Sequence, residues 1–398
     1  TTDALWADLN NDGYTDLVAV SGGNEFYGED EHNMPRVYLN SKEGLLKKKT
    51  DAFTGLYLTA AAVTASDINN DGFTDLFIGS RTIPFNYGQV PSSYILINDG
   101  QGKFTDRTEQ YAPGLKQAGF VTSAQWFDLN ADQHQDLLCT YEWGVPTAWI
   151  WEKGKLVKHE LSSNKGWWNF LLPADLDLDG DMDFIAGNLG LNSRLKATAD
   201  EPVQLYVNDF DNNGKNEQVL TYYLQGREIP FANKAELEKQ MPGLKKKYLY
   251  AADFAKAKLN ELFSPDKLST ATRYSATYFS NAVLINQGNL KFDLIALPYT
   301  AQLSPIRCAT LVNANGDPLP DILIGGNFYE SNIEMGRYDA DQGTVLLNQG
   351  KGQFKAEALN GVAVKGQVRH IAPVMINKQQ AYVLALNNDS TRVIRFRQ

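Results

Sequence analysis

Cysteine and histidine are scarce in this chain, which limits the chemistry it can support. Its 398 residues include two cysteines, Cys139 and Cys308, and four histidines, at positions 32, 134, 159 and 370. Two cysteines exclude a disulfide framework but do not decide the redox compartment. The histidines are not spaced like metal ligands, and no Ser/His/Asp or Cys/His order stands out. The sequence therefore gives hydrolase chemistry little support.

Long apolar runs and an excess of positive charge are also missing. No stretch reaches the roughly 18 uninterrupted apolar residues of a membrane span, and the first residues do not form a charged region followed by an apolar one. The net charge of −10 argues against nucleic acid, because neutralising phosphates needs a basic face. With 43% hydrophobic residues the chain can bury a large core. We therefore expect a globular protein with no nucleic-acid partner and no transmembrane segment.

What the sequence does contain is a repeated acidic loop. "ADLNNDGYTDLVAV" (7–20) places four oxygen-bearing side chains at alternating positions around Gly13 and then runs into apolar residues. "SDINNDGFTDLFIG" (66–79) and "ADLDLDGDMDFIAG" (174–187) are close copies. The uneven spacing of the copies indicates a repeated unit with variable loops.

Three further copies depart from this pattern. The copy at 127–140 keeps its oxygen ligands but has Gln133 where the glycine belongs. The copy at 208–221 closes with Glu217 in place of Asp, and a sixth copy at 312–325 opens with Asn313 and has Pro318 at the glycine position. Metal binding by these three copies is therefore less secure than by the first, second and fourth.

A second element recurs in the same units. "SYILINDGQGKF" (93–104), "AVLINQGNLKF" (282–292) and "TVLLNQGKGQF" (344–354) each join a β-rich run, a turn with Asn or Asp and Gly, and an aromatic residue that begins the next run. This is a hairpin signal. The unit thus predicts four antiparallel strands, and its repetition predicts an all-β fold, a β-propeller of four-stranded blades.

The acidic loop has a direct interpretation as a calcium site. Calcium takes six to eight oxygen ligands, and side chains at positions 1, 3 and 5 of a tight loop converge on one point, with a backbone carbonyl at position 7 and a carboxylate at position 9. A glycine at position 6 supplies a positive φ. An EF-hand would need flanking helices and a Glu at position 12. This chain has Ala19, Ile78 or Ala186 at that position and β-branched and apolar flanks, so the loops are not EF-hands. An Asp/Asn-rich turn without metal remains the alternative for any single copy.

We expect about three to five structural calcium ions, since calcium would neutralise carboxylates that otherwise repel one another. The predicted ligands, with backbone carbonyls at the seventh position, are Asp8, Asn10, Asp12, Tyr14 and Asp16; Asp67, Asn69, Asp71, Phe73 and Asp75; Asp128, Asn130, Asp132 and Asp136; Asp175, Asp177, Asp179, Asp181 and Asp183; and Asp209, Asp211, Asn213, Lys215 and Glu217.

These residues carry a family resemblance. The D-x-[DN]-x-D-G-x-x-D-[LF] loops at 8–17, 67–76 and 175–184, with the later L-x-N-x-G-x-G-x-F element, resemble the FG-GAP/VCBS repeats of integrin-α-type propellers. The resemblance is particularly to bacterial cell-surface and secreted proteins related to cartilage acidic protein. It implies calcium between the first and second strands of a blade and an extracellular or cell-surface setting, but no settled activity.

Seven blades in one domain, residues 1–398, is the expected architecture. Acidic loops opening at 175 and 209 lie close together, so six blades remain the alternative. The stretch 233–263 is rich in Ala, Leu, Lys and Glu and predicts two short helices inserted into one blade. Residues 367–398 predict a metal-free blade of three strands. Because the first unit begins inside its own first strand, we expect upstream residues to complete the ring and the chain to be part of a longer protein.

The cysteines and tryptophans receive structural predictions. Cys139 and Cys308 are expected on opposite sides of the ring, both free and buried, because a disulfide needs a Cα spacing of roughly 5.5 to 6 Å. Four tryptophans in strand-like runs, at positions 149, 151, 167 and 168, are expected in the blade core.

The loops between second and third strands must emerge opposite the acidic loops, because successive strands alternate in direction. They are long and aromatic, and aromatic rings combined with polar groups suit sugar or protein surfaces. Simple packing of the loops on one another is the alternative. The candidate ligand-binding residues on this face are Tyr27, Arg81, Tyr87, Trp143, Asn188, Arg194, Asn327, Tyr329, Glu330 and Arg337.

Two classes of function remain open. The first is a calcium-stabilised extracellular or cell-surface binding or scaffold module whose partner is a glycan or a protein. The second is a polysaccharide-degrading enzyme, a hydrolase or lyase, in which two of Glu25, Glu142, Glu330 and Asp339 would act as acid and base. No catalytic residue can be assigned, and fold alone cannot decide between the two.

Overall fold

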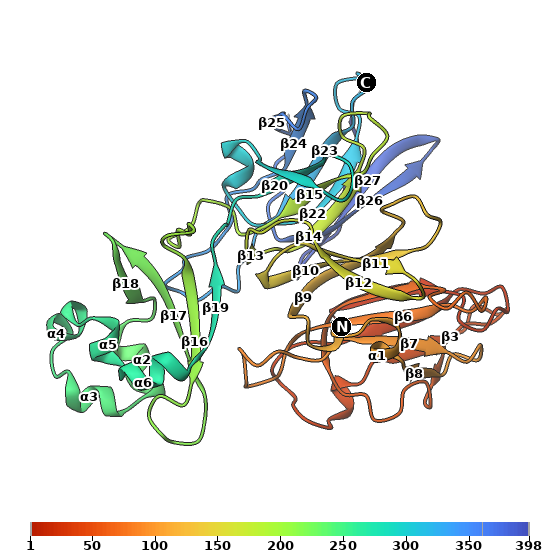
Figure 1. Ribbon diagram of the computed structural model, residues 1–398. Coiled ribbons are helices and arrows are strands. Elements are labelled where there is room, and N and C mark those ends of the chain that lie inside the picture. Colours follow the sequence, from red (N-terminus) through yellow and green to blue (C-terminus); the bar gives the residue numbers. More distant parts are fainter. Residues whose placement is uncertain (1, 360, 397–398) are drawn as a thin grey trace.

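The repeated units form antiparallel sheets in the computed structural model, which describes residues 2–359 and 361–396. Seven sheets are present in this part of the chain (Figure 1). The predicted all-β class, with blades mostly of four antiparallel strands, is confirmed. Seven was also the expected number of such units, although one of them is placed in an unexpected way.

Five sheets are built from consecutive strands. They are β1 (Asp3–Ala7), β2 (Asp16–Val20), β3 (Arg36–Leu39) and β4 (Lys47–Lys49); β5 (Thr59–Ser66), β6 (Asp75–Thr82), β7 (Tyr94–Asn98) and β8 (Phe104–Asp106); β9 (Phe120–Phe127), β10 (Asp136–Gly144), β11 (Thr147–Glu152), β12 (Lys155–Glu160) and β13 (Gly166–Trp167); β22 (Ile306–Val312), β23 (Asp321–Gly326), β24 (Thr344–Asn348) and β25 (Phe354–Ala358); and β26 (Val368–Ile376), β27 (Gln379–Leu386) and β28 (Arg392–Ile394). The last of these has the three strands predicted for it.

Two sheets are nested, one inside the other. The outer sheet has the order β14 (Phe170–Ala174), β15 (Asp183–Gly187), β20 (Ala282–Asn286) and β21 (Phe292–Ala296). The inner sheet lies between β15 and β20 in sequence and has the order β18 (Arg227–Pro230), β17 (Glu217–Leu224), β16 (Val203–Asn208) and β19 (Thr272–Ala276). The acidic loop at 209–217 therefore belongs to a sheet of its own.

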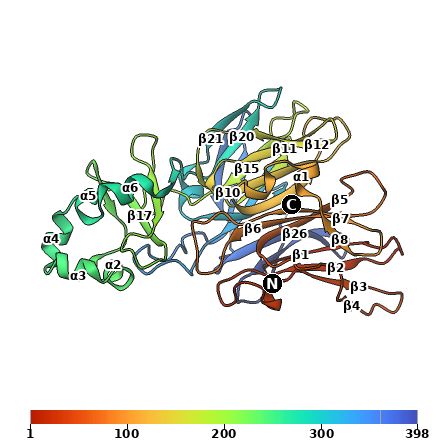
Figure 2. The same ribbon diagram turned by 60° about the horizontal axis from the view of Figure 1, so that its bottom comes forward.

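The other six sheets surround a common axis. The first strands contact one another in the series β1, β5, β9, β14, β22 and β26. Asp3 of β1 interacts electrostatically with His370 of β26, which brings the last sheet back beside the first. The inner sheet and its helices project from this ring, as both views show (Figures 1 and 2). The projection contacts β10 and β13 through β19.

Apolar side chains fill the space between neighbouring sheets. Leu138 and Ile150 of the third sheet pack in one buried cluster with Phe184 and Leu284 of the nested outer sheet. Burying a side chain of this size contributes roughly 1.5 to 3 kcal/mol relative to leaving it exposed. Trp149 and Trp168 are fully buried as predicted, whereas Trp151 and Trp167 are only partly buried.

The predicted helical stretch is confirmed in place and corrected in number. Residues 233–263 contain α2 (Lys234–Gln240), α3 (Gly243–Lys247), α4 (Ala251–Lys256) and α5 (Leu259–Leu262), and α6 (Pro265–Thr270) follows. Helices this short are unstable alone. Leu237, Met241 and Phe263 hold them in place by packing with Tyr206 and Val219 of the inner sheet. A short 4-residue helix, α1 (Thr108–Tyr111), and three single 3-10 turns complete the described elements.

Both cysteines are free and buried, as predicted. Burial raises the pKa of the Cys139 thiol to about 12 and also raises the pKa of Cys308, which makes both unreactive in the folded state. Their expected placement is wrong. Cys139 lies in β10 and Cys308 in β22, and a single sheet, that of β14, separates these two sheets.

Candidate functional site

Each of the six acidic loops connects two neighbouring antiparallel strands of one sheet; the first loop, for example, connects β1 and β2. In the first loop, Asp8 Oδ1 accepts a hydrogen bond from the backbone N–H of Asp12 (3.2 Å) and Oδ2 accepts one from Gly13 (2.8 Å). The chain turns through positive φ at Asn11 (+53°) and Gly13 (+85°), where glycine is the least strained residue. The loop is therefore a tight turn organised by its own acidic side chains.

The carboxylate at the ninth loop position has a separate task. Asp16 is fully buried; its Oδ2 accepts from the N–H of Leu9 (2.9 Å) and its Oδ1 from that of Asn40 (2.7 Å), just beyond β3. This carboxylate clamp ties the loop to the third strand. The same pair of bonds is made by Asp75 to Ile68 and Asn98, by Asp136 to Leu129 and Trp151, by Asp183 to Leu176 and Asn286, and by Asp321 to Ala314 and Asn348.

Burial makes the charge on the clamp costly. Desolvation raises the pKa of Asp75 and of Asp183 to about 6, against the lowering effect of their two backbone hydrogen bonds. Neighbouring loop carboxylates, Asp177 and Asp179 in the case of Asp183, raise the pKa further. A cation in the loop would remove this repulsion.

The fourth loop fits a hard divalent cation. Asp175 Oδ1 and Asp177 Oδ1 are buried acceptors with no hydrogen-bond partner in the described part of the chain. One carboxylate oxygen from each of Asp175, Asp177 and Asp179 lies within 4.8 Å of the others. Buried acceptors without donors suit an oxygen-preferring ion such as calcium. A bound ion would supply positive charge to these three carboxylates.

The other loops differ in how fully they form such a cage. In the fifth loop, Asp209, Asp211 and Glu217 also bring ligand oxygens within 4.8 Å of one another. The first three loops have Asn at position 3, so an amide oxygen replaces one carboxylate.

Two departures from the loop pattern have different consequences. Gln133 adopts φ +70° and its N–H still bonds Asp128 Oδ2 (2.8 Å), so the third loop keeps the glycine-loop geometry at the cost of strain. In the sixth loop Pro318 replaces the residue with positive φ at position 6, and only the fourth position, Gly316 (+82°), keeps a positive φ; its N–H donates to Asn313 Oδ1 (2.7 Å). This turn differs from the others, yet the Asp321 clamp is retained.

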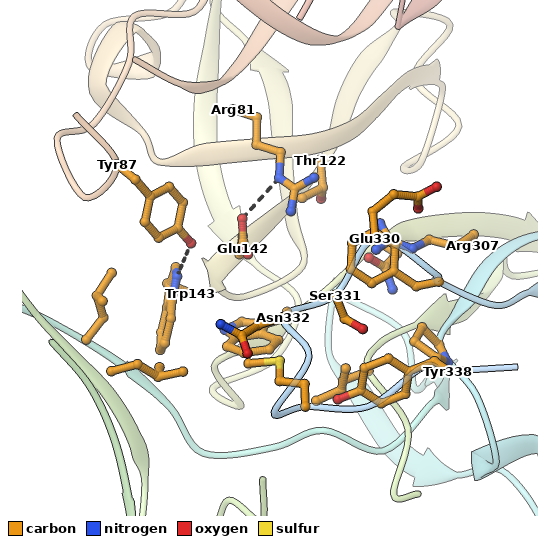
Figure 3. A pocket seen from close by; sticks show the side chains of 18 residues that line it. Arg81, Tyr87, Thr122, Glu142, Trp143, Arg307, Glu330, Ser331, Asn332 and Tyr338 are labelled. Carbon is orange, nitrogen blue, oxygen red and sulfur yellow. Dashed lines mark hydrogen bonds and ion pairs between the residues drawn. The ribbon is translucent and has the colours of Figure 1, made fainter. Parts of the chain in front are cut away.

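A cavity of about 500 Å³ lies at the opposite end of the sheets, between the ring and the inner sheet (Figure 3). Much of one wall comes from the loop between β23 and β24, which an isolated bridge between Phe328 and Tyr338 folds back on itself. The lining residues are Arg81, Tyr87, Thr122, Glu142, Trp143, Trp167, Asn169, Leu189, Leu205, Leu220, Pro305, Arg307, Phe328, Glu330, Ser331, Asn332, Met335 and Tyr338.

We call this cavity, lined by the residues just given, the axial cavity. An ion pair and several aromatic rings lie in its wall. Arg81 Nε lies 3.0 Å from Glu142 Oε2, and Trp143 Nε1 donates to Tyr87 Oη (2.7 Å), as the dashed lines in Figure 3 show. Trp143 stands edge-on to Trp167 with ring centroids 5.2 Å apart. Trp143 also has φ +64°, next to an irregularity in the β10–β13 pairing. Such strain in a bulky residue is typical of functional sites.

The predicted loop-face residues do not all meet in this cavity. Arg81, Tyr87, Trp143 and Glu330 line it, and so does Glu142. Six others lie elsewhere, namely Tyr27, Asn188, Arg194, Asn327, Tyr329 and Arg337.

These six side chains have identifiable local partners. Asn188 is fully buried, with Oδ1 accepting from the N–H of Trp167 and Nδ2 donating to Tyr278. Asn327 is likewise buried and donates to the carbonyls of Asp341 and Gly366. The remaining four are paired on the surface: Tyr27 with Phe85, Arg194 with Phe231, and Arg337 with Tyr329.

The first strands of the ring sheets, and the residues just before them, supply cavity residues that the sequence analysis missed. Thr122, Asn169 and Arg307 each stand six positions before the first ligand of an acidic loop. Thr2 and Ala61 occupy the same relative position and line an adjoining cavity. Counting back from each loop would therefore have found the residues that surround the axis.

Comparison with known protein families supports the repeat assignment. A family described as "FG-GAP-like repeat" matches residues 8–78 and 128–186. Both stretches are FG-GAP-like repeats. The first FG-GAP-like region contains the first and second acidic loops, and the second contains the third and fourth. The fifth and sixth loops lie outside the matched residues.

Comparison with solved structures gives distant similarities. The V. cholerae biofilm matrix protein Bap1 is 12% identical with a TM-score of 0.36, covering 97% of this chain and 66% of that chain. BBS1N, solved in complex with ARL6DN, is 9% identical with a TM-score of 0.36, covering 99% of this chain and 91% of that chain. No curated protein matches this chain.

Mutation can distinguish the structural role of the clamp carboxylate, Asp183, from cation binding by the other loop carboxylates. We expect Asp183→Ala to destabilise the protein with or without calcium by about 2 to 5 kcal/mol, because two buried N–H groups lose their acceptor. Asp177→Asn should reduce stability only when calcium is present. Urea unfolding with calcium and with chelator measures both effects. The exposed Asp181→Asn variant is the control, and equal behaviour of Asp183→Ala and Asp177→Asn would contradict the distinction.

Calcium and protons should compete at these loops. Since the pKa values of Asp75 and Asp183 are about 6, calcium affinity should fall as the pH drops through 6. The folded-state pKa values exceed the unfolded ones, so the stabilisation that protonation gives the metal-free protein is present below about pH 4 and is lost as the pH rises through about 6. Calorimetric titration and melting curves at about pH 5 and about pH 7.5 test both signs. Asp75→Asn should weaken the dependence.

Proposed function

We propose that this chain is a calcium-stabilised binding module that recognises an extracellular glycan or protein partner through the axial cavity. The observation that carries the proposal is the cavity itself. It is concave and lies where the first strands of the ring sheets meet long loops. It combines aromatic rings with a few oriented polar groups. Tyr87, Trp143 and Trp167 offer faces and edges on which a sugar ring can pack.

Calcium supports this function from the far end of the sheets. The acidic loops are remote from the cavity, so bound ions would stabilise the blades and take no part in ligand contact. Several of the loop carboxylates are exposed, for example Asp12 and Asp71. Exposed loops of this kind suit the weak calcium affinities of extracellular modules, about 10⁻⁴ to 10⁻³ M. An extracellular or cell-surface location is therefore part of the proposal.

A polysaccharide-degrading activity is the second candidate, because Glu142 and Glu330 line the same cavity. Both carboxylates have an arginine beside them. Glu142 is paired with Arg81, and Glu330 lies 3.6 Å from Arg369. Burial raises the pKa of Glu330, but hydrogen bonds such as that from Gln367 and the charge of Arg369 lower it overall. A general acid needs a raised pKa, whereas the pKa of Glu330 is lowered.

No helix in the described residues is long and apolar enough to span a membrane.

The other two predicted acid–base candidates, Glu25 and Asp339, are not among the residues lining the axial cavity. The binding function is therefore better supported than catalysis.

Removal of calcium should lower the melting temperature substantially. Each site that binds only the folded state adds about 2.7 kcal/mol at a hundredfold excess of calcium over Kd. Calcium should restore stability better than magnesium, because magnesium demands octahedral geometry. Differential scanning calorimetry with elemental analysis measures the effect. An unchanged melting curve after exhaustive chelation, with less than about one calcium per chain beforehand, would show that the loops are acidic turns only.

Binding and catalysis can be distinguished in one set of assays. On a glycan array we expect the protein to retain a restricted set of saccharides, and Trp143→Ala to abolish this, with circular dichroism showing that this variant, which loses a buried ring, is still folded at the assay temperature. In a reducing-end assay with the same saccharides we expect no release of sugar. Release that disappears in both Glu142→Gln and Glu330→Gln would establish the enzymatic alternative instead. The surface variant Tyr27→Ala is the control.

A further inference from the structure

Arg307 is a cation without a counter-ion inside the axial cavity. It belongs to β22, the first strand of its ring sheet, and lines both the axial cavity and the adjoining cavity. Within the described part of the chain it forms no ion pair, and its buried Nε has no hydrogen-bond partner. Its guanidinium carbon lies 5.0 Å from the centroid of the Phe328 ring.

The neighbouring charges do not compensate Arg307. Two other arginines flank it, but Arg81 is occupied by Glu142 and Arg369 by Glu330. Three guanidinium groups and two carboxylates leave one positive charge in excess. Burial, followed by repulsion from Arg81 and Arg369, lowers the pKa of Arg307 to about 9, which still leaves it protonated at neutral pH. Such a charge is expensive to keep buried unless an anion joins it.

A second unpaired donor lies in the same wall. The indole N–H of Trp167, which also lines the axial cavity, is buried and has no acceptor. Among the described residues, the unpartnered buried polar atoms of the lining side chains are thus both N–H donors. Arg307 is only partly buried, so the exposed part of its guanidinium is the group that a ligand in the cavity would meet, and it favours acceptor oxygens and one negative charge.

We propose that the axial cavity binds an acidic saccharide, with the carboxylate of a uronic acid seated on Arg307. This inference rests on the proposed binding function and specifies its ligand class. A planar guanidinium matches a carboxylate in a two-point geometry, and one excess positive charge matches a monoanion better than a phosphate dianion. The aromatic wall of Trp143 and Trp167 accommodates the sugar ring beside the anchored carboxylate.

The test compares saccharides that differ only in charge. Short oligomers containing galacturonate, glucuronate or mannuronate are titrated calorimetrically into the calcium-loaded protein, alongside their methyl esters and neutral oligomers of equal length. At least one acid should bind roughly ten- to hundredfold more tightly than its ester. Arg307→Gln should remove this preference, whereas Arg107→Gln, which removes an exposed arginine after β8, should keep it.

Stability provides an independent readout. If Arg307 serves a ligand, Arg307→Gln should melt at the same or a higher temperature without ligand, because a buried unpaired charge is removed. A lower melting temperature together with unchanged acid preference would overturn the proposal and make Arg307 structural.

The remaining outcomes separate this inference from the proposed function. Equal binding of acids, esters and neutral oligomers, lost in Trp143→Ala, would overturn the role of Arg307 and leave saccharide binding intact. Binding of a glutamate-rich peptide but of no saccharide would overturn the saccharide assignment. Binding of none of these probes would overturn both.

Discussion

A buried carboxylate at the ninth position of each acidic loop is the constraint on which the blades depend. An ionised aspartate inside an apolar sheet is tolerated only when its oxygens are satisfied. Asp16 and its four aspartate counterparts achieve this with one N–H from their own loop and one from the end of the third strand. The clamp thereby fixes three strands relative to one another. It persists in the sixth loop, where the turn is different, so the clamp and the ion site are separable properties of one motif.

The asparagine after the third strand extends this network between blades. Asn98 Nδ2 donates to the carbonyl of Leu9 in the preceding blade, and Asn348 Nδ2 donates to that of Leu176. The L-x-N element, which the sequence identifies only as the start of a hairpin, therefore connects one blade to the loop of another. Loop, hairpin and neighbouring blade form one hydrogen-bonded unit, which explains why the two sequence elements recur together.

Local patterns allowed much of this structure to be predicted, and non-local pairing limited the rest. Strand alternation, acidic loops and hairpin turns are encoded within about a dozen residues, and these were recovered. The nesting of β16–β19 was not, because its strands and loop have the same local signature as a ring blade. Asn188 and Asn327 were expected to face a ligand, yet a buried asparagine satisfies backbone groups equally well. Arg307 was overlooked because the charges around it come from other blades and from a long loop.

The nested arrangement places part of the cavity wall in a segment of the chain that contains no ring strand. Phe184 pairs with Leu284, so the chain leaves the ring and returns to the same sheet after an excursion of about a hundred residues. Leu205 and Leu220 of that excursion form part of the cavity wall, while the clamps of the ring lie outside it. Natural variation in the excursion can therefore reshape one wall of the cavity without shifting the register of any ring strand. Changes to this wall of the cavity and changes to the ring would therefore fall in different parts of one chain.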